Sequence, residues 1–282
     1  MSTEIRRQYH EELDDVRTSI ARLGAMVIEC IPMGTEALLS DDLGDAKAVI
    51  DGDDPIDALS IEIEEHCYRL LALQQPMARD LRAIMTAVRL ISEMERSADL
   101  MVNVAKASRR LYGVEFDPRL RGLVSRMAEE AQRLFELAVD SYVDGDVDKA
   151  AALDDMDDAL DSLHKQFIKA IFESHQASKL ALEAGVQLAL IGRYYERIGD
   201  HAVNIGERVL YMVTGWLPEH TGAARDAARL AAEASPFSSG PDTDDRDGEA
   251  GDHREDHAGA AAGAGAGPPV DRPGAAASNE GP

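Results

Sequence analysis

Basic and aromatic side chains are scarce in this chain of 282 residues. It has 29 Lys and Arg against 53 Asp and Glu, a net charge of −24, and only 5% aromatic residues. The shortage of positive charge argues against nucleic acid as a partner, because binding to the phosphate backbone depends on clustered Lys and Arg. With so few aromatic residues, the core must consist of Leu, Ala, Ile, Val and Met, a composition that favours packed helices over sheets.

Cysteine and long apolar runs are also rare. The two cysteines, Cys30 and Cys67, form no Cys-x-x-Cys pair, which excludes zinc-ribbon and dithiol redox motifs, and we expect both to be reduced core thiols. There is no run of 18 apolar residues, and no apolar segment follows the start Met1–Arg7. We therefore expect a cytoplasmic protein without a signal peptide or direct membrane insertion.

The common catalytic motifs are missing as well. The chain has no Gly-Lys pair, no His-Glu-x-x-His and no Gly-x-Ser-x-Gly, which excludes a Walker A loop, a zincin helix and a nucleophile elbow. It also has no Glu-x-x-His, the motif on which carboxylate-bridged di-iron bundles depend. These absences lead us to expect a protein that is not an enzyme, and a carboxylate-bridged metal enzyme remains an alternative.

The remaining pattern is helical up to about residue 221, a stretch that has only five prolines. We expect Pro32 to kink the first helix and Pro55 to be the point at which the second can divide. The segment 222–282 includes the Ala/Gly run Ala258–Gly267 and few large apolar side chains, so we expect a disordered tail. The turn signals predict six helices, at about 4–40, 44–73, 77–111, 117–143, 146–175 and 178–215.

An internal repeat divides the helical part into two halves. Residues 37–107 align without a gap on residues 138–208, with 17 identities in 71 positions, against roughly five by chance. Each copy has three predicted helices, and short loops make sequential helices antiparallel neighbours. We therefore predict an all-α fold of two tandem, pseudo-symmetric three-helix bundles, with domains at 1–111, 112–221 and 222–282.

The best-matched segments carry carboxylates at helical spacing. The third helix of each copy has Glu-x3-Asp-x3-Asn, and steps of four residues keep these side chains on one face of a helix. The second helix of each copy adds an Asp-x3-Asp pair. If the second and third helices are antiparallel neighbours, the acid pair on one helix of each bundle lies opposite the acid pair on the other. The eight acids are Asp53, Asp57, Glu95, Asp99, Asp154, Asp158, Glu196 and Asp200.

Like charges this close repel one another, and partly buried carboxylates are costly without a partner. Neighbouring arginines, protonation or a hard cation would relieve the repulsion. Because the same pairs recur in both copies, we predict bound divalent or ferric ions, such as Fe, Mn, Zn or Mg. A helical scaffold whose acids simply face water is the alternative. His201 follows Asp200, and we expect it to be a capping or surface residue rather than a ligand.

The segment Glu196–Glu207, with the sequence Glu-Arg-Ile-Gly-Asp-His-Ala-Val-Asn-Ile-Gly-Glu, closely resembles the signature of the PhoU family. Leu73–Arg82 is similar to that family's turn between its second and third helices, and Tyr9–Leu13 also fits. The resemblance covers about residues 4–217. The first copy departs from the signature because Ser97 and Ala98 stand where Ile and Gly are usual.

The resemblance implies a two-bundle fold and metal binding through the paired acidic motifs. It also implies a regulatory role, in which the protein represses phosphate-starvation signalling when phosphate is plentiful. The expected partners are the ATPase subunit of the phosphate ABC transporter, a sensor histidine kinase and a second copy of the chain in a homodimer.

Overall fold

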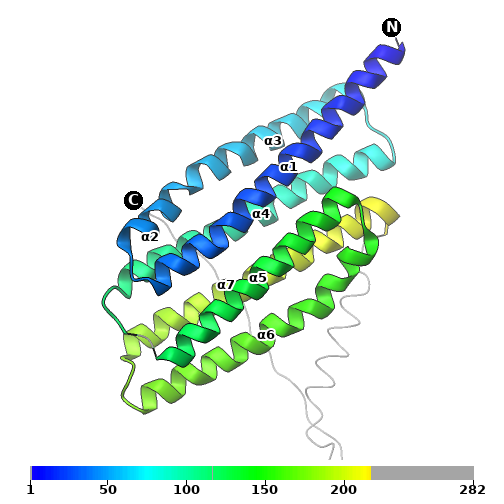
Figure 1. Cartoon of the computed structure of the whole chain (residues 1–282). Helices are drawn as coiled ribbons and strands as arrows, with labels where there is room; N and C mark the ends of the chain where they lie inside the picture. The colour runs from blue at the N-terminus through cyan, green and yellow to red at the C-terminus, as the bar shows by residue number, and fades with distance from the viewer. Residues whose placement is uncertain (1, 116, 217–282) are drawn as a thin grey trace, which may run out of the picture. The chain divides into compact units, whose positions relative to one another are not determined.

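The computed structural model describes residues 2–115 and 117–216, and these form seven α-helices with no strand (Figure 1). The predicted all-α fold is confirmed. The predicted disordered tail, 222–282, lies outside the described residues. The helices are α1 Ser2–Leu39, α2 Leu43–Asp51, α3 Asp53–Gln74, α4 Arg79–Arg110, α5 Pro118–Asp144, α6 Val147–Gln176 and α7 Leu182–Thr214.

The helices form the two predicted three-helix bundles. In the first, α1, α3 and α4 pack against one another, with the short α2 against α1 and α4; in the second, α5, α6 and α7 do the same. Figure 1 shows α3 and α6 at the outer edges, and the bundles meet where α1 packs on α5 and α4 on α7. All the described residues fall in one compact unit, and the predicted boundary at residue 111 lies in the connector between α4 and α5.

The second predicted helix divides into α2 and α3, so the described chain has seven helices instead of six. The division falls at Gly52, whose N–H donates to the carbonyl of Ala48 at 2.9 Å as α2 ends. Pro55 then sits in the first turn of α3, where its missing N–H costs nothing. By contrast, α1 continues through Pro32 to Leu39.

Aspartate side chains start three of the helices. Asp42, Asp117 and Asp146 each accept hydrogen bonds from backbone amides in the first turn of α2, α5 and α6, the usual role of a residue at this position. At the other end of α5, Gly145 adopts φ 63°, a left-handed conformation that glycine tolerates and that turns the chain into α6. These short turns make α5 and α6 antiparallel neighbours.

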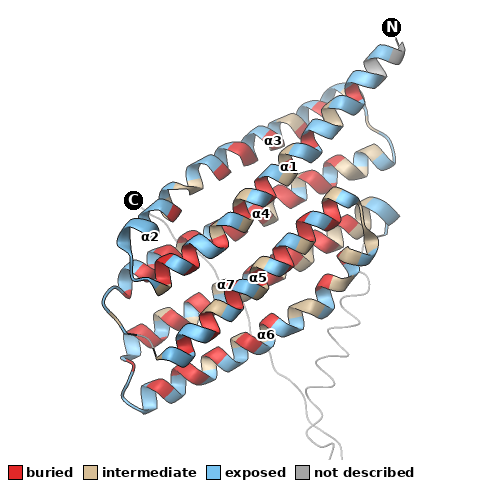
Figure 2. Cartoon of the chain, in the orientation of Figure 1, coloured by how far each residue is buried: buried red, intermediate tan, exposed pale blue. Residues whose placement is uncertain are grey.

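The core lies along the inner faces of the helices, as the buried residues in Figure 2 show. It is mostly aliphatic, and the largest fully buried side chains are Tyr195, Phe135 and Phe167. Cys67 is buried and Cys30 half-buried, and both are free thiols, as predicted. No helix among the described residues is long and apolar enough to cross a membrane.

Contacts between α4 and α7 define the junction of the two bundles. Arg82 Nε donates to the carbonyl of Met212 at 3.3 Å, and Thr86 Oγ1 donates to the carbonyl of Arg208 at 3.4 Å. Because the partner's number falls as the number on α4 rises, the two helices run antiparallel. On the neighbouring side, the hydroxyls of Thr35 on α1 and Tyr195 on α7 share a hydrogen bond of 2.7 Å.

Candidate metal sites

The four predicted acids of the first bundle lie close together between α3 and α4. Burial, followed by the charges of Asp57 and Asp99, raises the pKa of Asp53. Burial and the same two charges raise the pKa of Glu95. None of the four carboxylates makes an ion pair or hydrogen bond with another described residue. Lys106 opposes the pKa shift of Asp53, and Arg96 opposes that of Glu95. The repulsion among the four acids is therefore only partly relieved, by charges that make no ion pair with them.

The second bundle has a half-buried carboxylate that the sequence analysis missed. Asp157 on α6 has its pKa raised to about 7, first by burial and then by the charges of Asp161, Asp200, Asp158 and Asp154. Its Oδ1 atom is buried and has no hydrogen-bond partner among the described residues. The repeat gave no signal for this acid, because the matching position in the first copy is an isoleucine.

Asp157 lies over the backbone of α7 at Gly199. A Cβ atom at Gly199 would overlap Asp157 Oδ1 and come within 2.7 Å of Leu160 Cδ2. The glycine of the family-like signature thus lets α6 and α7 approach at the level of the acids. Asp154 and Asp158, the two α6 acids that the sequence predicts, are exposed, whereas Asp157 faces the neighbouring helix.

The two predicted acids of α7 are partly compensated by an arginine. Arg193 pairs with Glu196 one turn away, and its Nη2 lies 3.7 Å from Asp200 Oδ2. Burial raises the pKa of Asp200, Arg193 opposes this, and Asp161 adds to it. Asp200 therefore meets the acids of α6, whereas Glu196 turns to Arg193. The spacing of three and seven residues from Glu196 and Asp200 is the signal that would have found this arginine.

The carboxylates do not converge on a single point. Within residues 2–115 and 117–216, no three or more His, Cys, Asp or Glu side chains are grouped so that they could hold a metal ion as they lie. The chemistry of the donors still fits a hard cation, since the first seam offers only carboxylate oxygens. The carboxylate side chains would have to rotate to bring their oxygens around one ion. The eight acids therefore remain predicted ligands.

The expectation that His201 is a capping or surface residue was wrong. His201 is 6% exposed, and its Nδ1–H donates to Glu93 Oε2 on α4 at 2.6 Å, while Asn204 Nδ2 donates to the same oxygen at 3.1 Å. Burial alone would raise the pKa of Glu93, but these hydrogen bonds hold it below its usual value. These three residues join the two bundles. The sequence could not predict this contact, because it does not give the register of α4 against α7.

These features define a class of all-helical protein, built of two equivalent three-helix bundles with acids between the second and third helix of each. Residues 20–108 and 124–209 match the PhoU domain family. The chain belongs to the PhoU family.

Named relatives and solved structures agree with this assignment. The chain is 36% identical over 215 residues to the phosphate-specific transport system accessory protein PhoU homolog 1 of Mycobacterium tuberculosis, covering 76% of this chain and 96% of the relative. The crystal structure of PhoU from Pseudomonas aeruginosa matches with a TM-score of 0.70 and 30% identity, over 74% of this chain and 100% of that one. PhoU from Streptococcus pneumoniae, a phosphate transport system regulatory protein, matches with a TM-score of 0.69 and 28% identity, over 74% of this chain and 98% of that one.

Proposed function

We propose that this chain is a metal-binding adaptor that regulates phosphate uptake and phosphate-starvation signalling. It links the ATPase subunit of a phosphate ABC transporter to a sensor histidine kinase and represses the response when phosphate is abundant. It acts in the cytoplasm as a homodimer and has no catalytic activity. Support for the regulatory role comes from the family, whose matched members are named as accessory or regulatory proteins of phosphate transport.

The observation that carries the metal proposal is the acid seam of the first bundle, whose four carboxylates make no ion pair with a described residue. Asp53 and Glu95 have raised pKa values partly because Asp57 and Asp99 lie near both. Four carboxylate oxygen donors suit a hard divalent or ferric ion, which removes this repulsion when it binds. The second bundle contributes Asp154, Asp158, Glu196 and Asp200, and the charges of Asp154, Asp158 and Asp200 act on Asp157.

The adaptor role is tested by capture of the two partners. Tagged full-length protein is used to pull down the transporter ATPase and the histidine kinase from cells grown in high and in low phosphate. We expect both partners, identified by mass spectrometry, with more kinase captured in high phosphate. Capture of neither partner under either condition would count against the adaptor role without bearing on metal binding.

A metal-free scaffold is the competing function, and one observation favours it. In the second bundle, Arg193 already pairs with Glu196 and Asp200, so these two acids of α7 have a positive charge beside them without a metal. Calorimetric titration of the full-length, chelator-treated protein with Mn²⁺ separates the two functions. We expect saturable binding that Asp53→Asn with Glu95→Gln weakens strongly. Absence of binding to the wild-type protein favours the scaffold.

A further inference from the structure

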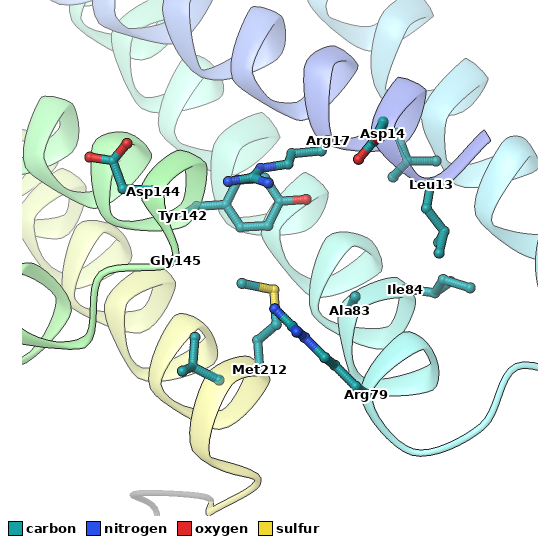
Figure 3. Close-up of a pocket in the computed structure, with 12 residues that line it drawn as sticks. Leu13, Asp14, Arg17, Arg79, Ala83, Ile84, Tyr142, Asp144, Gly145 and Met212 are labelled. Carbon is teal, nitrogen blue, oxygen red and sulfur yellow. The ribbon is translucent and has the colours of Figure 1, made fainter. Parts of the chain in front are cut away.

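A cavity of about 530 Å³ lies away from the acidic seams, where α1 and α4 meet the ends of α5 and α7 (Figure 3). This volume is within the range of small-molecule binding sites, about 300–1,000 Å³. One part of its wall is apolar and offers a surface for a carbon skeleton. This part consists of Leu13, Val16, Ala83, Ile84, Met212 and Val213.

Two arginines without acid partners line the same cavity. Figure 3 shows Arg17 extending from α1 to the ring of Tyr142, and Arg79 extending from the start of α4 towards Met212. Neither guanidinium forms an ion pair or hydrogen bond with a described residue. In a chain with a net charge of −24, these two exposed arginines balance the two acids, Asp14 and Asp144, that line the same cavity.

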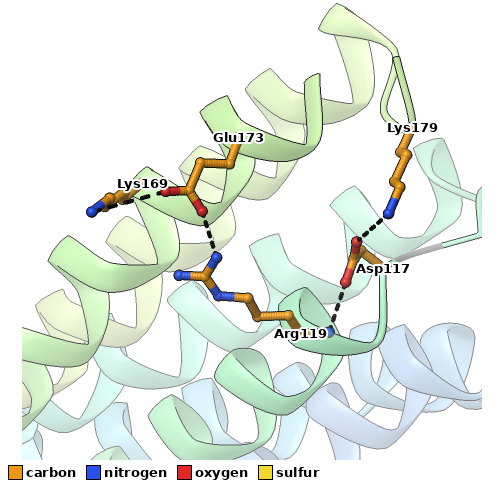
Figure 4. Close-up of polar contacts among 5 residues, drawn as sticks. All are labelled: Asp117, Arg119, Lys169, Glu173 and Lys179. Atoms are coloured by element: carbon orange, nitrogen blue, oxygen red, sulfur yellow. Dashed lines mark hydrogen bonds and ion pairs between the residues drawn. The ribbon is translucent and has the colours of Figure 1, made fainter. Parts of the chain in front are cut away.

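A smaller cavity between α5 and α6 shows the contrasting arrangement. It is lined by Arg119 and Lys179, but there Arg119 pairs with Glu173, and Lys179 Nζ lies 3.8 Å from Asp117 Oδ2 (Figure 4). Its bases are already neutralised, so it offers no excess charge to a ligand. The cavity at Arg17 and Arg79 differs because its bases remain available.

Tyr142 supplies a buried donor. Its side chain comes from α5 and is only 4% exposed, and its hydroxyl has no hydrogen-bond partner among the described residues. Burial, and then Cys67, raises its pKa, with Arg17 opposing them, so the phenol is neutral at pH 7 and donates a hydrogen bond. The hydroxyl oxygen itself is not sealed from solvent, so a ligand oxygen that enters the cavity can accept its hydrogen bond.

Two acids complete the lining. Asp144 is paired with Lys149, whose Nζ lies 2.6 Å from Asp144 Oδ2, so it does not neutralise the arginines. Asp14 stands at the rim on α1 and forms no ion pair within the described part of the chain. The balance is two guanidinium groups against one free carboxylate, which favours an anionic ligand.

This cavity does not follow from the internal repeat. Gly145 and Met212, which line it, correspond to Gly44 and Leu111 in the first copy. Near that position, the connector after α4 is tied to the turn between α1 and α2, because the N–H of Gly113 donates to the Asp41 carboxylate at 3.0 Å. The cavity at Tyr142 is therefore a feature of one end only, and not a consequence of the shared bundle geometry.

We propose that the cavity binds a small phosphate monoester. Arg17 and Arg79 hold the phosphate by charge-assisted hydrogen bonds, Tyr142 donates a third, and the organic part lies on the apolar wall. The apolar wall and the volume select an ester over inorganic phosphate, and the two guanidinium groups select a dianion over a single carboxylate. The site shares no residue with the acidic seams, so its failure would leave the metal and adaptor proposals unaffected.

Calorimetric titration of the full-length protein tests the ligand class. The probes are AMP and glucose 6-phosphate as two unlike esters, adenosine as the body without the phosphate, and inorganic phosphate as the anion alone. We expect saturable binding of at least one ester, with adenosine and inorganic phosphate each binding at least about tenfold more weakly. No binding of either ester at millimolar concentration, or equal binding of inorganic phosphate, would overturn the proposal.

Variants locate the bound ester in the cavity. We expect Arg17→Gln with Arg79→Gln to weaken ester binding by about a hundredfold. The matched pair Arg22→Gln with Arg89→Gln removes exposed arginines from the same two helices, outside the cavity, and should leave binding unchanged. Equal loss in the two pairs would mean that overall charge, not this site, attracts the ester.

Ala83→Trp fills the cavity and keeps every charge, so it should abolish binding as well. Persistent binding of the ester to this variant would contradict the site. Thermal melting curves show that each variant is folded before it is titrated, and Tyr142→Phe, which removes only a hydroxyl, provides a second readout if Ala83→Trp does not fold.

Discussion

The contact between Asp157 and Gly199 gives a sharp test of the second acidic seam. We predict that Gly199→Ala destabilises the protein, although alanine is favoured over glycine in a helix by about 1 kcal/mol. The added Cβ would overlap Asp157 Oδ1 and approach Leu160 Cδ2 to 2.7 Å. Overpacking of this kind costs about 1–3 kcal/mol. Subtracting the helix-propensity gain leaves a net loss of up to about 2 kcal/mol, which lowers Tm by up to about 8 °C.

A double-mutant cycle tests whether the Asp157 carboxylate causes this loss of stability. In the Asp157→Ala background the obstructing carboxylate is gone and only the flexible Leu160 remains, so Gly199→Ala should cost at least about 1 kcal/mol less. Gly122→Ala on α5 is the matched control, because nothing lies within 4 Å of a Cβ atom at Gly122. We expect this substitution to stabilise the protein by about 1 kcal/mol.

Urea unfolding followed by circular dichroism, in buffer with a metal chelator, measures all four free energies of the cycle. If Gly199→Ala has the same cost with and without the Asp157 carboxylate, the two residues are not in contact and the close approach of α6 and α7 is wrong. If Gly199→Ala is as stabilising as Gly122→Ala, the packing described for this seam is refuted.

Three further predictions concern buried polar groups. Asp157→Asn should stabilise the metal-free protein more at pH 8 than at pH 5. The folded pKa of Asp157 is about 7, above its usual 3.8, so its ionisation destabilises the native state progressively as pH rises between these values. An equal effect at both pH values in urea unfolding would contradict this. Glu93→Gln should cost about 1.5–3 kcal/mol in urea unfolding at pH 7, because the Glu93 carboxylate accepts hydrogen bonds from His201 and Asn204. The loss should shrink below pH 4. A loss under about 0.5 kcal/mol would refute the role of these hydrogen bonds between α4 and α7. Burial raises the pKa of Cys67 to about 11. At pH 8 a disulfide reagent should therefore react with Cys67 at least about a hundredfold more slowly in the folded protein than in urea. Equal reaction rates would refute the burial of Cys67.

Local sequence signals were enough to predict the fold. Proline, glycine and aspartate at the turns placed most helix ends within a few residues, and the offset of 101 residues gave the two equivalent bundles. The break at Gly52 was harder to predict, because Pro55 is tolerated in a first turn and α2 ends at Asp51, four residues before it.

The candidate sites were only partly accessible from the sequence. The repeat pointed to the four acids of the first seam, whose charges interact in the structure although no three of them converge on one point. It could not identify Asp157, whose counterpart Ile56 is apolar, or the bridge from Glu93 to His201, whose counterparts are Tyr194 and Leu100. Both depend on helix register and on asymmetric positions, which similarity between copies cannot provide.

Elemental analysis of purified full-length protein tests the proposed metal binding most directly. Wild type is compared with a variant carrying Glu95→Ala, Asp99→Ala, Glu196→Ala and Asp200→Ala, with helical content checked by circular dichroism. We predict bound iron, manganese, zinc or magnesium in the wild type and its loss from a variant that keeps its helices. Equal metal content in the two proteins, or none in the wild type, would contradict the assignment of these acids as ligands.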